Sequence, residues 1–307
     1  MNDRVKIRFN YDTESEMEKV LSVPMFESIK TGISKITGGK VTWCEMKNLK
    51  TTFYHDTNSV NITGSLIQFR HNNQPNKKHI SPELYANNTY EDICFATDYI
   101  SSLFAKDKRE MKLTGLEFSL TTHVPEPPSF YMGGLNSIQK KPYYYLPPPR
   151  NHSEPLEKYC SFSQYTAKCY NWGAWNDVPG NLLRWEISCR KMQKVKQLTG
   201  RRTITLADLT DKLFQRDMAN FSMKTLRNTD KQFLIDCSDL QPKEMMLYHA
   251  GKDVKFWNNL KKNNVNTCKK MRADYLRLCN RLENRIDNSY HDLEYRLQSK
   301  FEYLMSN

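Results

Sequence analysis

The fold of this chain is decided by residues 161–192, which read SFSQYTAKCYNWGAWNDVPGNLLRWEISCRKM. Residues 165–170 and 182–189 both alternate between apolar and polar side chains, and this period of two predicts β-strands. The residues that join them favour a loop, because they adopt the backbone angles that turns need: Gly173, Asp177, Pro179 and Gly180. The stretch therefore predicts two strands joined by a loop.

The two faces of these strands differ in character. Successive side chains of a strand point to opposite faces of its sheet, so one face is mostly apolar and suits a core. The other face carries Lys168, Tyr170, Arg184, Glu186 and Ser188. Two interpretations stay open at this point. The polar face is only solvated, with cross-strand pairs worth ~0.2–1 kcal/mol each, or its charged groups and phenol form a site on an open sheet face.

Composition indicates the class of partner. The chain has 307 residues, a formal net charge of +12 and a pI near 9.2. Its hydrophobic fraction of 38% is enough for a core, while a mean hydropathy of −0.74 indicates a heavily charged surface. A strongly basic pI is typical of nucleic-acid-binding domains, so we expect a nucleic-acid partner. The alternative is a basic surface that only prevents aggregation.

The cysteines and the hydropathy indicate the compartment. None of the eight cysteines forms a CxxC pair or a zinc-binding spacing, which favours reduced core residues. The first residues show no apolar signal core, and no window approaches ~18 continuous apolar residues. We therefore expect a cytoplasmic, bacterial protein without a membrane span. A Walker loop, a GxGxxG motif and an HExxH motif are all absent from the sequence, so a nucleotide-binding protein, a dehydrogenase and a zinc protease have no support here.

Regular elements are expected along most of the first two thirds of the chain. Period-two alternation predicts strands and helical spacing predicts helices. The expected helices are 14–36, broken at Pro24, and 83–105, and the expected strands are 5–9, 40–45, 51–55, 59–69 and 112–124. The last strand places Glu117 and His123 on a polar face.

Residues 125–155 form a long segment rich in proline, which excludes a central strand or a helix there. Loops of this length are uncommon unless they are functional or disordered. The segment connects the Glu117 strand to the Tyr170 strand. It is therefore either an aromatic, basic flap over the polar face or an ordinary surface insertion.

The last part of the chain has helical periodicity. Thr205 is a candidate N-cap for a helix that continues through Met218. From about Asp253 onward, apolar residues recur at steps of three and four, which predicts a long amphipathic helix, broken once or twice at most. Its first half is basic. The helix has three possible roles: it lies on DNA phosphates, pairs with another helix in a homodimer, or packs back on the sheet.

Several short motifs, taken together, resemble phage and plasmid replication proteins of the rolling-circle initiator family, of the Bacteroidetes type. Their order and spacing match from about residue 1 to about residue 215. The motifs are MNDRVKIRF at residues 1–9, NITGSLIQF at 61–69, LTGLE at 113–117, KCYNWG at 168–173, NLLRWE at 181–186, KM at 191–192 and TLADL at 205–209.

This resemblance implies an α+β fold: an antiparallel, roughly five-stranded sheet with helices on one face, followed by a long C-terminal helical region. It implies a domain at 1–215, containing the 125–155 insertion, and a helical region at 216–307. It also implies an endonuclease reaction in which a tyrosine attacks a DNA phosphodiester, leaving a 5′-phosphotyrosine and a free 3′-hydroxyl, with Mg²⁺ or Mn²⁺ as cofactor.

Site residues carry over from the motifs one at a time. Tyr170 matches the family's tyrosine, while Glu186 and Glu117 match its metal-binding carboxylates. Lys168 and Arg184 would hold the phosphate. His123 is a candidate third metal ligand, and Tyr165 is an alternative nucleophile, although it faces the apolar side of a regular strand.

The chain departs from the family pattern in two places. A YDKG pattern is common after the tyrosine, but this chain has Asn171 and Trp172 before Gly173, and it has no His-x-His pair. Three functions therefore stay open: a nicking initiator at an origin, a non-catalytic sequence-specific DNA-binding protein on the same scaffold, and a basic structural protein. The expected partners are single-stranded or duplex DNA, a host helicase or polymerase, and no membrane.

Overall fold

The computed structural model describes residues 2–35, 37–72, 86–231, 240–251, 253–283 and 289–307. The chain divides into two compact units. Unit 1 comprises Met1–Asp230 and Leu293–Asn307, and unit 2 comprises Lys231–Asp292. No helix in the described ranges is long and apolar enough to cross a membrane.

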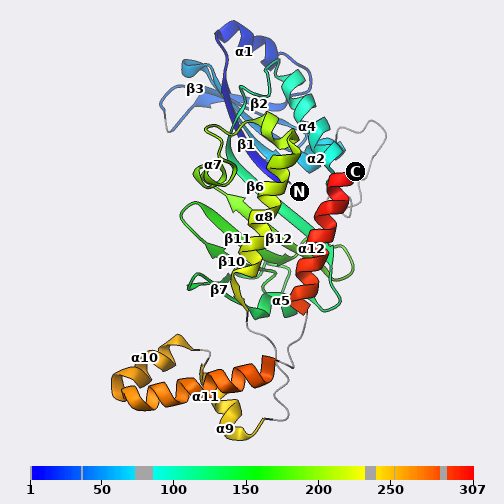
Figure 1. The fold of residues 1–307 in the computed structure, drawn as a ribbon. Helices are drawn as coiled ribbons and strands as arrows, with labels where there is room; N and C mark the ends of the chain where they lie inside the picture. The colour runs from blue at the N-terminus through cyan, green and yellow to red at the C-terminus, as the bar shows by residue number, and fades with distance from the viewer. Residues whose placement is uncertain (1, 36, 73–85, 232–239, 252, 284–288) are drawn as a thin grey trace. The chain divides into compact units, whose positions relative to one another are not determined.

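Unit 1 is built on an antiparallel sheet with the strand order β2-β3-β4-β5-β1-β6-β12-β11-β10-β9 (Figure 1). The α+β class and the antiparallel sheet are confirmed, but the expectation of roughly five strands is wrong, since the sheet has ten. In chain order its strands are β1 (Asn2–Asn10), β2 (Glu27–Ile33), β3 (Lys40–Met46), β4 (Leu49–Tyr54), β5 (Ser59–Ser65), β6 (Lys112–His123), β9 (Tyr144–Tyr145), β10 (Glu157–Ser161), β11 (Tyr165–Asn171) and β12 (Leu182–Cys189). A separate small sheet contains β7 (Leu135–Ile138), β8 (Lys141–Pro142) and β13 (Thr229–Lys231).

The expected strand pair is present as the β11–β12 hairpin. Lys168 lies opposite Glu186, and Tyr170 lies opposite Arg184. β12 also pairs with β6, where Ser188 lies opposite Glu117. The polar residues of three neighbouring strands therefore share one face of the sheet.

Helices cover the opposite, apolar face of these strands. Helix α8 (Lys212–Arg227) and helix α12 (Ser289–Ser306) run across this face (Figure 1). The indole of Trp185 in β12 donates a hydrogen bond of 3.3 Å to the carbonyl of Ser222 in α8. The ring of Phe118 in β6 lies 6.3 Å from that of Phe301 in α12. Placing the helices on one face leaves the polar face for the site.

Two expected helices differ from the structure. The run 14–36 forms a helix only as α1 (Glu14–Leu21), and its second part pairs with β3 as strand β2. The exposed, β-branched residues of β2 form no apolar stripe that would stabilise a helix. The second expected helix is α4 (Tyr90–Leu103), capped by Thr89 and Asp92, while residues 83–85 of that expectation lie outside the described residues.

Strand 59–69 is also shorter than expected. β5 ends at Ser65, and the chain continues as helix α2 (Leu66–Asn72). The Pro-rich segment contains helix α5 (Pro128–Gly134), and β7 is the central strand of the small sheet, so the exclusion of a helix and of a central strand there is wrong. Its proline stands at the first helical position, where the missing N–H is not needed.

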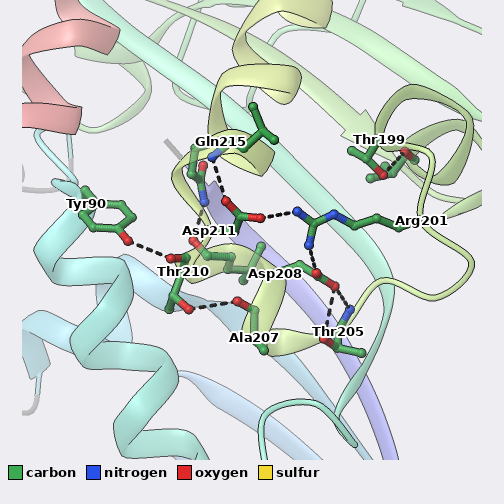
Figure 2. A network of polar contacts seen from close by, with 12 residues as sticks. Tyr90, Thr199, Arg201, Thr205, Ala207, Asp208, Thr210, Asp211 and Gln215 are labelled. Carbon is green, nitrogen blue, oxygen red and sulfur yellow. Dashed lines mark hydrogen bonds and ion pairs between the residues drawn. The ribbon is translucent and has the colours of Figure 1, made fainter.

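The Thr205 cap is present, but it starts a short 3₁₀ turn, η2 (Leu206–Thr210), rather than a single helix through Met218. Asp208 accepts hydrogen bonds from the Thr205 backbone N–H and hydroxyl. Asp211 then caps α8, and the Arg201 guanidinium contacts both Asp208 and Asp211 (Figure 2). One arginine therefore fixes the corner between the turn and the helix.

Shorter elements complete unit 1: η1 (His55–Thr57), α6 (Trp172–Trp175) and α7 (Gln193–Thr199). The expected long C-terminal helix is divided. Helices α9 (Pro242–Gly251), α10 (Val254–Asn263) and α11 (Val265–Glu283) belong to unit 2, whereas most of α12 packs in unit 1.

Candidate functional site

The polar sheet face contains a cavity of about 540 Å³. β11 contributes Lys168 and Tyr170, β12 contributes Arg184 and Glu186, and β6 contributes Glu117. The wall is completed by the following residues: Asp3, Arg4, Glu45, Asn48, Lys50, Thr63, Gly64, Ser65, Gln68, Glu157, Trp172, Trp175 and Asn176. The structure therefore brings five of the seven expected site residues into one cavity.

Glu186 is the centre of the cavity's hydrogen-bond network. The residue is buried, with 3% of its surface exposed. One oxygen, Oε1, accepts a hydrogen bond of 2.7 Å from the Lys168 ammonium, and the other, Oε2, accepts one of 3.0 Å from the Tyr170 hydroxyl. A buried carboxylate needs such partners, because an unpaired charge is costly away from water. Tyr170 and Lys168 are thereby held on either side of one acid.

Arg184 is fixed from the opposite side of the cavity. Its Nε donates to the Thr121 hydroxyl at 2.7 Å, and one terminal nitrogen contacts the Asp3 carboxylate at 2.8 Å. Asp3 also accepts a hydrogen bond of 2.7 Å from Ser65. The guanidinium carbon lies 5.1 Å from the centre of the Trp172 ring, within cation–π range.

Glu117 completes the set of charges. It accepts a hydrogen bond of 3.0 Å from Ser188, and its nearest oxygen lies 3.9 Å from the Lys168 nitrogen. Burial and the negative charge of Glu186 raise the pKa of Glu117 above its usual value. Two carboxylates and one lysine are therefore close together and partly buried.

The titration of Tyr170 and Lys168 follows from these neighbours. Burial, together with the Glu186 charge, raises the pKa of Tyr170 well above its usual 10, while the Arg184 charge opposes the rise. Burial lowers the pKa of Lys168, but Glu186 and Glu117 outweigh it, so the net pKa of Lys168 is raised. At neutral pH the phenol is therefore protonated and the lysine is charged.

The structure separates the other two expected site residues from the cavity. The Tyr165 ring lies 5.1 Å from that of Phe221 in α8, on the helix-covered face of the sheet. His123 is exposed at the end of β6 and lines a different cavity together with Lys300. Tyr170 is therefore the one of the two candidate tyrosines that lies beside Glu186 and Lys168.

The expected Mg²⁺ or Mn²⁺ ligands can be tested against this arrangement. Glu117 and Glu186 both lie in the cavity, and the Lys168 ammonium lies 3.9 Å from the nearest oxygen of Glu117 and 2.7 Å from that of Glu186. His123 lies elsewhere, and in the described part of the chain no group of three or more His, Cys, Asp or Glu side chains is close enough to hold a metal. Of the three expected ligands, the structure therefore brings only Glu117 and Glu186 together, and a Mg²⁺ or Mn²⁺ site at these carboxylates stays a prediction.

Aromatic residues from the β11–β12 loop, and not the Pro-rich segment, form a wall of the cavity. Trp172 and Trp175 line it, and Trp175 is 48% exposed. The flap hypothesis placed residues 125–155 there. In the structure, Lys158, on the opposite side of β10 from Glu157, donates to the carbonyls of Gly133 and Leu135 in that segment. The segment therefore packs on the other face of the sheet.

Two properties of the site differ from the sequence-based expectation. The polar side chains of β12 are not exposed as expected, since all residues of this strand are buried. Asp3 was missed, since its contact with Arg184 spans 181 residues and depends on the pairing of β1 with β6. The sequence predicted a strand at residues 5–9 from its alternation, but alternation does not show which strand pairs with it, and so could not place Asp3 beside Arg184.

Basic side chains surround the cavity. Arg4, Lys6 and Arg8 alternate with the buried apolar residues of β1 and are exposed. A neighbouring cavity of about 470 Å³ shares Arg4, Glu117 and Lys168 and adds Lys6 and Arg190. The neighbouring cavity, lined by four cations and one acid, therefore suits an anionic ligand, whereas the lining of the first cavity has five acids and four cations.

No family model matches this chain, and no curated protein matches it. Among solved structures, one similar chain is a rolling circle replication initiator protein from Geobacillus stearothermophilus, with 12% identity, a TM-score of 0.45, and coverage of 79% of this chain and 89% of that chain. Another is the di-domain ARO/CYC BexL from the BE-7585A biosynthetic pathway, with 9% identity, a TM-score of 0.19, and coverage of 74% and 97%. Neither similarity is high enough to establish a shared fold.

Proposed function

We propose that this protein is a replication initiator that binds DNA and cleaves one strand by transesterification, with Tyr170 as the nucleophile. The observation that carries the proposal is the hydrogen bond of 3.0 Å from the Tyr170 hydroxyl to Glu186, inside a cavity that also holds Lys168 and Arg184. A nucleophile beside a base, with the base held by a third group, is the arrangement that activates a hydroxyl. The role in replication is supported by the motif resemblance across residues 1–215.

The raised pKa of Tyr170 defines what Glu186 must do. Because the free phenol is protonated at neutral pH, Glu186 accepts the proton as the Tyr170 oxygen attacks phosphorus. The new O–P bond forms while the bond from phosphorus to the 3′ oxygen breaks. The products are a 5′-phosphotyrosine and a 3′-hydroxyl, whose oxygen takes a proton from water.

Lys168 and Arg184 stabilise the charge that develops on the phosphate. Proton transfer neutralises Glu186, so the ammonium of Lys168 is released from its 2.7 Å ion pair as negative charge builds on the phosphoryl oxygens. Positive groups aimed at developing charge in a water-poor site are an effective form of catalysis. No step of this proposal passes through a metal ion.

The test uses supercoiled circular DNA that carries the protein's own replicon, incubated with Mg²⁺, with Mn²⁺ and with EDTA. We expect open circles with protein attached at one 5′ end. Tyr170→Phe removes only the hydroxyl and abolishes the covalent product, while the matched Tyr165→Phe, on the opposite sheet face, retains it. A covalent product formed by Tyr170→Phe overturns the assignment.

A second function, a non-catalytic sequence-specific DNA-binding protein, is favoured by one observation. Glu186, Lys168 and Tyr170 satisfy one another's hydrogen bonds, as a purely structural buried network also would. This function predicts specific binding without cleavage under any of the three conditions. The third function, a basic structural protein, predicts no salt-dependent affinity for DNA at all.

A further inference from the structure

Unit 2 contains a concentrated positive patch that the proposed reaction does not use. The segment Lys261–Arg272, KKNNVNTCKKMR, has five cations and no acid. We define the basic corner as Lys261, Lys262, Lys269, Lys270 and Arg272, all of which are exposed. No ion pair is recorded for them among the described residues.

The basic corner lies at the bend between helices α10 and α11 of unit 2. Helix α10 ends at Asn263, and α11 begins at Val265. Asn264 accepts a hydrogen bond of 3.0 Å from the Thr267 backbone N–H, and its own N–H donates to the Leu260 carbonyl at 2.9 Å. The two lysines that end α10 and the two in the first turns of α11 are therefore joined by one ordered residue.

The apolar side of α11 is already occupied within unit 2. Leu278 and Leu282 form a buried cluster with Tyr248 and Leu240. An interfacial helix inserts a free apolar face into lipid, and α11 has its apolar side packed, so a membrane surface does not fit. The exposed residues of α11 are mainly polar and basic, with Val265 and Leu276 as isolated large apolar exceptions.

The composition of the corner also separates a nucleic acid from a protein partner. Protein interfaces are enriched in aromatic residues and depleted in lysine, whereas the basic corner consists mainly of lysine and has no exposed aromatic residue. Single strands need aromatic platforms for their bases. Here Trp257 and Tyr275 are only partly exposed, and their rings pack against each other at 5.7 Å.

We infer that the basic corner of unit 2 binds the phosphate backbone of duplex DNA, without reading its sequence. This is a second DNA contact, separate from the cavity of unit 1 and independent of Tyr170. Each lysine that neutralises a phosphate releases counterions, so the contact is strongly salt-dependent.

The test is a salt titration of the full chain with a labelled duplex that lacks the replicon sequence, so that strand cleavage does not enter the measurement. The variant carries Lys261→Gln, Lys262→Gln, Lys269→Gln and Lys270→Gln. Because each phosphate contact contributes about −0.9 to the slope of log Kobs against log salt, we expect the loss of four contacts to make the slope shallower by about 3.6. Affinity should fall by at least about tenfold at low salt.

The matched control carries four other exposed lysine substitutions, Lys19→Gln, Lys30→Gln, Lys35→Gln and Lys140→Gln, with the same change in net charge. It should keep the wild-type slope. Equal loss in both variants overturns the inference, because net charge alone would then explain binding. A loss seen with single-stranded DNA but not with the duplex overturns it as well. Nicking of replicon DNA is measured separately, so failure of either proposal is distinguishable from failure of the other.

Discussion

Glu186 connects the chemistry of the cavity to its stability. Its carboxylate is buried and joins the Lys168 ammonium to the Tyr170 hydroxyl. The Glu186 carboxylate that would accept a proton during cleavage therefore also neutralises the partly buried Lys168 ammonium. A substitution at this residue should affect both properties.

Glu186→Gln should therefore abolish formation of the covalent DNA product and lower the free energy of unfolding. The amide keeps the shape of the side chain but removes the negative charge beside Lys168, for a cost of about 2 kcal/mol. Urea denaturation measures the stability, and the nicking assay measures the activity. The control is Glu157→Gln, because Glu157 lines the same cavity but makes no hydrogen bond to Tyr170 or Lys168 among the described contacts. Equal loss of the covalent product in both variants would contradict the role of Glu186.

Arg184 is a second residue whose geometry is specific. Its guanidinium donates to Thr121 with one nitrogen and contacts Asp3 with another, and a lysine cannot reach both. Arg184→Lys should destabilise the fold by about 1–3 kcal/mol, because one buried partner is left unsatisfied. Thermal and urea unfolding measure this, with the exposed Arg190→Lys as the control. Unchanged stability of Arg184→Lys would show that the two contacts are not important.

At the scale of elements, the corner between η2 and α8 is held by polar side chains rather than by apolar packing alone (Figure 2). Thr205 caps the turn, Asp211 caps the helix, and Arg201 joins Asp208 to Asp211. The corner positions α8, whose Ser222 carbonyl accepts the Trp185 hydrogen bond behind the site.

Thr205→Ala should destabilise unit 1 by about 1 kcal/mol, the usual effect of removing an N-cap hydroxyl. The hydroxyl is lost, and Asp208 retains its contacts with the backbone N–H of residue 205 and with the Arg201 guanidinium. The midpoint of urea denaturation measures the effect. Thr203→Ala, at an exposed position two residues earlier, should leave the midpoint unchanged, and a similar shift in both variants would refute the role of the cap.

Arg201 should also give the corner a pH dependence. The hydrogen bond and charge of Arg201 lower the pKa of Asp211 below its ordinary value of 3.8. The resulting stability is therefore present above that value and is lost as the pH falls through the folded pKa. Arg201→Gln should reduce the acid-induced loss of stability between about pH 5 and pH 3. The free energy of unfolding at each pH measures this, and Arg202→Gln, which is exposed, should behave as wild type.

At the scale of the whole molecule, the C-terminal helix α12 is part of the core of unit 1. Leu297, Phe301 and Leu304 are buried there, and Phe301 lies against Phe118 of the central sheet. The apolar stripe that suggested a homodimer is occupied by the chain's own sheet. A homodimer through this helix stays a prediction, which the exposed tyrosines of α12, Tyr295 and Tyr303, would have to mediate.

Phe301→Ala should destabilise unit 1 by about 3–5 kcal/mol, because it leaves a large cavity at a position that is 2% exposed. Tyr295→Ala removes a similar ring at a position that is 71% exposed and should have little effect on unfolding. Urea denaturation of both variants measures the difference. Equal stability of the two variants would mean that α12 does not contribute to the core of unit 1.

The β11–β12 hairpin and the shared face of Lys168, Tyr170, Arg184 and Glu186 could be predicted from local alternation, which fixes the side of a strand on which each residue lies. The α+β class was predicted from the motif resemblance. Alternation could not give the number of strands in the sheet. β2 is almost wholly exposed and β9 has only two residues, so neither shows an alternating pattern, and both form only by pairing with a neighbouring strand.

Only the tertiary structure decided which distant groups meet in the cavity. The pairing of β1 with β6 brings Asp3 to Arg184, and the end of β6 carries His123 away from Glu117. It also placed Lys168 between two carboxylates, where a metal ion was expected, and divided the C-terminal periodicity between two units. These outcomes depend on strand register and long-range packing, which a local period of two or 3.6 residues does not specify.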